Sequence, residues 1–189
     1  MSSSVRAFLG NPPPEPRVRH YVLAIAGTVG LFYCMAALFF GMRMVMDVGG
    51  YCASGGSAYV IEQQCPEGSV LLVAPSIPVG FLFGAMMAYG FSGFSGGAAG
   101  LVLLFWPVLF LSLGWNFFEG AFNPPGDGGL DVGWLICGIV FWLMGAPAAY
   151  FAPKLFKGLG PRRPVILAIF FGGAVAGALL AKWLADTIA

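Results

Sequence analysis

The chain has 189 residues, of which 59% are hydrophobic and only 9% are charged, and its formal net charge is +1. Ordinary soluble domains carry about 25% charged residues, so a soluble fold of this length could not hide so much apolar side chain. Long apolar runs in the near-absence of charge indicate an all-α integral membrane protein. The sequence also offers no basic surface of the kind that binds nucleic acid.

Five apolar segments are long enough to cross the hydrocarbon core of a bilayer, which takes about 20 helical residues. Among Asp, Glu, Lys, Arg and His, only Lys182 falls within them. The polar, proline-rich residues before the first segment predict a disordered tail over 1–20, and the transmembrane domain is expected over 21–189. The predicted spans are 21–42, 70–91, 98–118, 132–151 and 165–184.

The basic residues predict the orientation, because Lys and Arg stay on the cytoplasmic side of a membrane. With the N-terminus inside, the inner segments 1–20, 92–97 and 152–164 carry seven bases and one acid, and the outer residues carry two bases and seven acids. The reverse orientation would place the basic segments outside. We therefore expect a cytoplasmic N-terminal tail, an outer C-terminus, and a turn without charge between the second and third spans.

Cys52 and Cys65 lie in the expected first outer loop, in a compartment that is oxidising in a bacterial cell envelope. A bridge across this spacing would stabilise the fold by about 3 kcal/mol in the chain-entropy picture, so we predict a disulfide that closes the loop. A catalytic dithiol is more often a close C-x-x-C pair. A zinc site needs two more ligands, and the only histidine, His20, is expected on the other side. No metal and no cofactor are predicted.

Cys34 and Cys137 lie within the first and fourth predicted spans. Both are interpreted as small, weakly polar packing residues. The alternative is that one of them relays electrons from the loop pair to a quinone-like carrier, for which the sequence supplies no second close dithiol.

Small residues at four-residue spacing predict where helices pack, because helices in lipid associate through close contact of small side chains. The second span has Gly80 and Gly84, and the fifth has Gly173 and Gly177. Residues 26, 30 and 34 form a similar stripe in the first span. Together these stripes favour a compact bundle, within one chain or between chains.

Prolines interrupt the predicted spans at Pro75, Pro78, Pro107 and Pro147. Each removes a backbone N–H and crowds the preceding turn, so static kinks are expected, with a moving hinge or a ligand cavity as the alternative. No span carries a charged residue at mid-depth, where such residues mark proton relays and ion sites. This counts against a proton-coupled carrier, a pump or a voltage sensor.

Asn116 and Glu119 are three residues apart, and so share a helix face at the outer edge of the third span. Arg43, at the outer end of the first span, is placed to pair with Glu119. The plain interpretation is an interfacial ion pair beside a turn-rich loop. The alternative is a polar rim, formed by Arg43, Asn116 and Glu119, for a lipid headgroup or a small ligand.

Met42 and Met46 are one helical turn apart, a spacing at which two thioethers can hold Cu(I). The chain has no Met-rich tail that would collect the metal. Methionine is also an ordinary filler of apolar gaps, and we interpret this pair in that way.

The segments "YCASGGSAY", at 51–59, and "QQCP", at 63–66, resemble a stretch in uncharacterised small multi-span membrane proteins of high-GC bacteria. The similarity extends loosely into "FWPVLFLSLGWNFFE", at 105–119. The resemblance implies a multi-pass protein of the bacterial cytoplasmic (plasma) membrane. It carries over no activity and no functional residue.

Three functions remain open at this stage. The first is a non-enzymatic accessory, scaffold or assembly component that acts on a membrane-protein partner or as a homo-oligomer in the lipid bilayer. The second is a small transport or lipid-handling protein with a cavity between proline-kinked helices. The third is a membrane thiol oxidoreductase that uses Cys52 and Cys65. We expect the first, and do not expect an enzyme.

Overall fold

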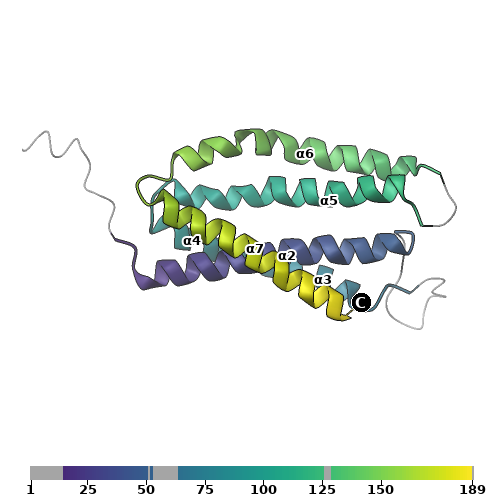
Figure 1. The fold of residues 1–189 in the computed structure, drawn as a ribbon, viewed down its shortest axis with the longest axis horizontal. Helices are drawn as coiled ribbons and strands as arrows, with labels where there is room; N and C mark the ends of the chain where they lie inside the picture. Colours follow the sequence, from purple (N-terminus) through teal and green to yellow (C-terminus); the bar gives the residue numbers. More distant parts are fainter. Residues whose placement is uncertain (1–14, 51, 53–63, 126–128, 189) are drawn as a thin grey trace, which may run out of the picture.

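The computed structural model describes residues 15–50, 52, 64–125 and 129–188 (Figure 1). This part of the chain is helical and contains no β-strand. Five helical segments are long and apolar enough to cross a membrane, which confirms the predicted all-α class and the number of spans. The helices are α2 (Val18–Asp47), α3 (Ser69–Val73), α4 (Ser76–Ser92), η1 (Ala98–Leu104), α5 (Phe105–Phe122), α6 (Val132–Lys157) and α7 (Arg163–Ile188).

The helix boundaries differ from the predicted spans in ways that follow from local chemistry. Helix α2 begins at Val18, inside the segment expected as a disordered tail, where the His20 ring accepts a hydrogen bond from the Arg17 backbone N–H at 3.1 Å. Residues 1–14 lie outside the described residues. The second span is two helices, α3 and α4, that meet at Pro75, because proline removes the backbone N–H that would continue the helix.

Three further prolines lie in helices that continue past them. The third span starts as the 3₁₀ helix η1 and becomes α-helical at Phe105, so Pro107 falls in the first turn of α5, a position at which proline is tolerated. Helix α6 continues through Pro147 and Pro153.

Consecutive spans run in opposite directions, and the described chain starts and finishes at opposite ends of the bundle (Figure 1). The end that holds the start of α2 is called here the N-terminal end. Ring contact between Tyr21 and Phe94 and a hydrogen bond from Arg162 to the Phe94 carbonyl (3.5 Å) join α2, the turn after α4, and the start of α7 there. The other end, which holds the close of α7, is called the C-terminal end.

Helix α2 takes part in the two most extensive helix pairings: α4 and α7 pack along it, while α5 pairs with α6 and touches α2 more lightly. Helix α6 is the least buried, with only Gly138 and Gly145 buried among its residues. The largest apolar cluster lies toward the N-terminal end and includes the buried rings of Phe91 and Phe94. The bundle therefore consists of an α2–α4–α7 group and an α5–α6 pair.

Glycines set the closest helix contacts. A Cβ added to Gly27 would overlap the Met87 backbone, and one added to Gly90 would overlap the Ala24 backbone, so α2 and α4 meet main chain to main chain. On α7, a Cβ at Gly177 would collide with the α2 backbone, and one at Gly173 would lie 2.9 Å from the Thr28 side chain. The packing role expected for Gly173 and Gly177 therefore corresponds to an observed α2–α7 contact.

Gly80 and Gly84 are buried on α4, and their contacts are looser than those of Gly173 and Gly177 on α7. A Cβ on either residue would find its nearest neighbour at an ordinary distance, 3.5 Å from Cys34 and 3.6 Å from Val102. These glycines do not bring two backbones together. They leave space, because the true α2–α4 contact lies nearer the N-terminal end, at Gly27 and Gly90.

Candidate functional site

An apolar pocket of about 320 Å³ lies between α2, α4 and the η1–α5 segment. Its wall on α4 includes Gly80 and Gly84, whose missing side chains create much of the space. Ile77 and Phe81 stand at its edge and are 54% and 70% exposed, so the pocket opens sideways, through the flank of the bundle. The volume is at the lower end of the about 300–1,000 Å³ typical of small-molecule sites.

The pocket exists because α4 stays packed on α2, whereas α5 pairs with α6. Helix α4 packs against η1 but has hardly any contact with α5, since α5 leans toward α6. The wall on that side comes from Val102, Phe105 and Leu109. Helix α2 therefore forms one wall of the pocket, and the loosely associated helices α4 and α5 form the walls beside it.

Only two lining residues carry a polar group. The hydroxyl of Ser76 donates to the Leu72 carbonyl at 2.5 Å, across the break between α3 and α4, and is thereby satisfied. The Cys34 thiol is buried and is not part of a disulfide. The surface of the pocket is therefore almost entirely apolar.

A second, polar pocket of about 120 Å³ lies at the C-terminal end, between α2, α5 and the start of α6. Arg43 forms an ion pair with Glu119, donating from Nη2 to Oε1 at 2.6 Å, and its Nε lies 3.3 Å from Asp47 Oδ1. The sequence placed Arg43 next to Glu119, and the structure has that pair; it adds Asp47 as a second partner. The guanidinium is therefore held between two carboxylates.

Asn116 is the most unusual member of this pocket. Its side chain is fully buried at 0% exposure, and its Nδ2 donates to the Phe39 carbonyl at 2.9 Å. Among the described residues, nothing donates to its Oδ1. A buried acceptor without a donor costs about 1–3 kcal/mol, so each such group needs an explanation.

Trp134 closes the polar pocket from the side of α6. Asp131 caps α6 by accepting a hydrogen bond from the Trp134 backbone N–H at 2.9 Å, which sets the start of the helix. The indole lies against Gly120 on α5 and Gly50 after α2, where any Cβ would collide with the ring. Two glycines thus make room for one aromatic wall.

Helix α5 links the two pockets on a single face. Phe105 and Leu109 line the apolar pocket, and Asn116 lines the polar one. Leu109 and Asn116 are seven residues apart, which is close to two full turns and about 10 Å of rise. The apolar and polar pockets therefore lie about two helical turns apart along one face of α5.

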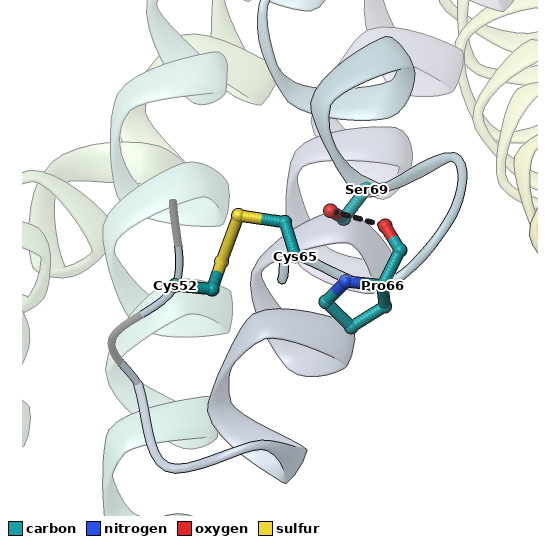
Figure 2. Close-up of a disulfide and its surroundings, with 4 residues drawn as sticks. All are labelled: Cys52, Cys65, Pro66 and Ser69. Carbon is teal, nitrogen blue, oxygen red and sulfur yellow. Dashed lines mark hydrogen bonds between the residues drawn. A yellow bond between two sulfur atoms is a disulfide. The ribbon is translucent and has the colours of Figure 1, made fainter. Parts of the chain in front are cut away.

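Cys52 and Cys65 are held sulfur to sulfur at 2.13 Å, with their Cα atoms 4.8 Å apart (Figure 2). The separation of the Cα atoms falls within the range of about 4.4–6.8 Å that disulfides span. Next to it, the Ser69 hydroxyl donates to the Pro66 carbonyl at 2.8 Å and starts α3 (Figure 2). The intervening residues 53–63 lie outside the described part, and neither cysteine lines either pocket.

The sequence left open a cavity between proline-kinked helices without locating it, and it missed the Gly27–Gly90 contact and the role of Trp134. Pro75 and the Gly80–Gly84 pair were visible signals, but only the divergence of α4 from α5 turns them into a cavity. Across the described residues, no three His, Cys, Asp or Glu side chains gather as they would to hold a metal ion.

The fold and the two pockets define a five-helix chain with spans suited to a membrane and with an apolar and a polar cavity in line. No protein-family model matches the chain, and no curated protein or solved structure shows significant similarity to it. Its function is therefore argued from the geometry alone.

Proposed function

We propose that this chain is a multi-pass protein of a bacterial cytoplasmic membrane that handles lipid by holding an acyl chain in the apolar pocket. The observation that carries the proposal is the sideways opening of this pocket between α4 and α5. Among the three functions that the sequence left open, this pocket supports lipid handling more specifically than it supports an accessory role. The accessory function is kept as the second candidate.

The shape and lining of the pocket suit a hydrocarbon chain. Its wall on α4 runs from Ser76 to Ala88, twelve residues apart, which corresponds to about 18 Å along the helix. Apolar cavities of this kind do not hold water. In a bilayer, a groove that opens to the hydrocarbon core at mid-helix is filled by a lipid chain at little cost.

Charge supports the proposed orientation, with the N-terminal end in the cytoplasm. The described residues of that end carry Arg17, Arg19, Lys154, Lys157, Arg162 and Arg163. Asp47, Glu67, Glu119, Asp131 and Asp186 belong to the C-terminal end, with Arg43 and Lys182. Basic residues remain on the cytoplasmic side, so Cys52 and Cys65 would face an oxidising compartment and brace the first outer loop.

Retention of lipid by the purified protein tests the proposal. The wild type is extracted gently, and native mass spectrometry counts the lipids that remain bound. The variant Gly84→Leu fills the pocket, because the new side chain starts 3.6 Å from Val102; Gly172→Leu is the matched control, since nothing lies within 4 Å of a Cβ at that helical glycine. We expect lipid on the wild type and the control and its loss from Gly84→Leu. Equal retention by all three would overturn the proposal.

The second candidate is an accessory component that binds a membrane-protein partner through α6. The observation in its favour is that α6 packs mainly on α5 and η1, touches α7 only near its end through Phe156, and leaves Trp142, Leu143 and Ile139 exposed. A stoichiometric partner that copurifies with the wild type and is lost from Leu143→Trp would support this function. A chain that purifies alone would count against it.

A further inference from the structure

We infer that the polar pocket at the C-terminal end binds a primary ammonium group, the headgroup amine of the same amphiphile whose chain occupies the apolar pocket. The inference rests on the proposed function and deepens it, because it names the chemistry of the lipid. It is carried by three observations on Arg43, Asp47, Asn116 and Trp134: an unused acceptor, an excess of negative charge, and the alignment of the two pockets.

The unused acceptor is Asn116 Oδ1. Its amide orientation follows from the neighbouring backbone, since Nδ2 must face the Phe39 carbonyl to donate at 2.9 Å, and this leaves Oδ1 as the group that lacks a donor among the described residues. A ligand that serves it must carry an N–H or O–H. An ammonium group supplies three such donors on one small atom.

The charges favour a cation over an anion. Arg43 supplies one positive charge, while Asp47 and Glu119 supply two negative charges. The Nε, Nη1 and Nη2 atoms of Arg43 already face these carboxylates, so the guanidinium is not offered to a phosphate. The net charge of Arg43, Asp47 and Glu119 together is −1. A phosphate would meet two carboxylates, and an ammonium meets a negative surplus.

The size and walls of the pocket fit a short amine. Its volume is about 120 Å³, room for several water-sized groups and thus for an ethanolamine-sized head. Trp134 forms one wall, and an aromatic face attracts a cation by about 0.5–2 kcal/mol. The indole is fixed in place by Gly120 and Gly50, so this wall is already formed before a ligand arrives.

The alignment of the pockets joins head to chain. Leu109 in the apolar pocket and Asn116 in the polar pocket share one face of α5, about 10 Å apart along the helix. On α2, Leu38 lines the apolar pocket and the next residue, Phe39, accepts from Asn116. One amphiphile with its head toward the C-terminal end can therefore reach both.

The test compares phosphatidylethanolamine, phosphatidylcholine and phosphatidylglycerol of identical chains, each offered to the delipidated full-length protein in nanodiscs and counted by native mass spectrometry. Wild type is expected to retain phosphatidylethanolamine about tenfold more than the other two, as one or two hydrogen bonds to a charged group imply. Asn116→Leu and Asp47→Asn should both reduce this preference, to about threefold or less. Asp47 is exposed and, within the described part of the chain, forms its ion pair inside its own helix, so Asp47→Asn tests the inference even where Asn116→Leu folds poorly.

The matched control is Asp186→Asn, which removes an exposed carboxylate from a similar i,i+4 pair with Lys182 at the same end of the bundle. It should leave the preference unchanged. Equal retention of the three lipids by the wild type would overturn the ammonium inference and leave the acyl-chain proposal standing. Absence of all retained lipid would overturn the proposed function.

A soluble amine is separated from a lipid headgroup by adding ethanolamine alone to the detergent-solubilised protein. If phosphatidylethanolamine is retained selectively and ethanolamine at millimolar concentration does not raise the melting temperature, the lipid is the source and the inference holds in full. If ethanolamine alone raises the melting temperature of the wild type but not of Asp47→Asn, and no lipid preference is found, the link between the two pockets is overturned.

Discussion

Gly90 on α4 lies against the main chain of Ala24 on α2, so closely that a Cβ on Gly90 would overlap the backbone nitrogen of Ala24. Ala24 is itself fully buried. The contact joins the first two spans near the N-terminal end. Gly90 is not part of the small-residue stripe that the sequence predicted at Gly80 and Gly84.

This relationship predicts that Gly90→Ala destabilises the bundle and Gly80→Ala does not. At Gly90 the new methyl meets backbone that cannot turn aside, and such overpacking costs about 1–3 kcal/mol. At Gly80 the methyl would sit 3.5 Å from Cys34, an ordinary contact. The measurement is the midpoint of thermal unfolding in one detergent; a larger loss for Gly80→Ala than for Gly90→Ala would contradict the α2–α4 contact.

A second pair of substitutions tests the α2–α7 contact. Gly177→Ala should lower stability by about 1–3 kcal/mol, because its methyl would collide with the α2 backbone. Gly172→Ala lies on the same helix with open space around it and should be neutral or stabilising by up to about 1 kcal/mol, since alanine favours the helix. The midpoints of unfolding by urea or guanidinium in mixed micelles would rank the stability of the two variants. Equal midpoints would contradict the close contact between Gly177 and α2.

The ion pair between Arg43 and Glu119 gives a third prediction. Glu119→Gln should destabilise more than Asp47→Asn, because Glu119 joins α5 to α2, whereas Asp47 pairs within α2. Both side chains of the Arg43–Glu119 pair are partly exposed, so the coupling energy should be only about 0.2–1 kcal/mol. A double-mutant cycle with Arg43→Met and Glu119→Gln measures it, and a coupling of zero would mean that the pair adds no stability.

The cysteines give a fourth prediction. Without reductant, Cys52 and Cys65 should resist alkylation, and intact mass should rise by two hydrogens after reduction. Replacing both by serine should cost about 3 kcal/mol for a loop of this length in the chain-entropy picture. A maleimide that cannot cross membranes should label the reduced pair in intact cells under the proposed orientation; labelling only after lysis would reverse it.

The structure also shows why the predicted spans were right in number and inexact at their ends. Apolar length and the absence of charge are local properties, and they located all five spans. Helix ends depend on neighbours: Val18 starts α2 earlier than hydropathy suggested because His20 and Arg17 cap one another. Pro75 divided the second span, whereas Pro147 did not break α6, although both prolines remove one N–H.

The same contrast holds for the candidate site. Arg43, Asn116 and Glu119 were visible from spacing, because a helix places residues three or four apart on one face. Asp47, Trp134 and the unused oxygen of Asn116 were not, since their roles depend on how α2, α5 and α6 meet. Sequence reasoning found the polar groups of the rim but not the cavity that they enclose.

The amino-acid sequence by itself determined that the chain is helical and that five segments are suited to a membrane. It also determined that most basic residues lie at one end of these segments and most acidic residues at the other. These follow from composition and period, which are properties of each segment alone. Only the tertiary structure decided that α2 takes part in the two most extensive helix pairings, that Gly27 and Gly90 rather than Gly80 and Gly84 bring backbones together, and that α4 parts from α5. The reason is physical: close packing is a property of two surfaces, so which glycine makes a contact and which leaves a pocket depends on the side chain opposite.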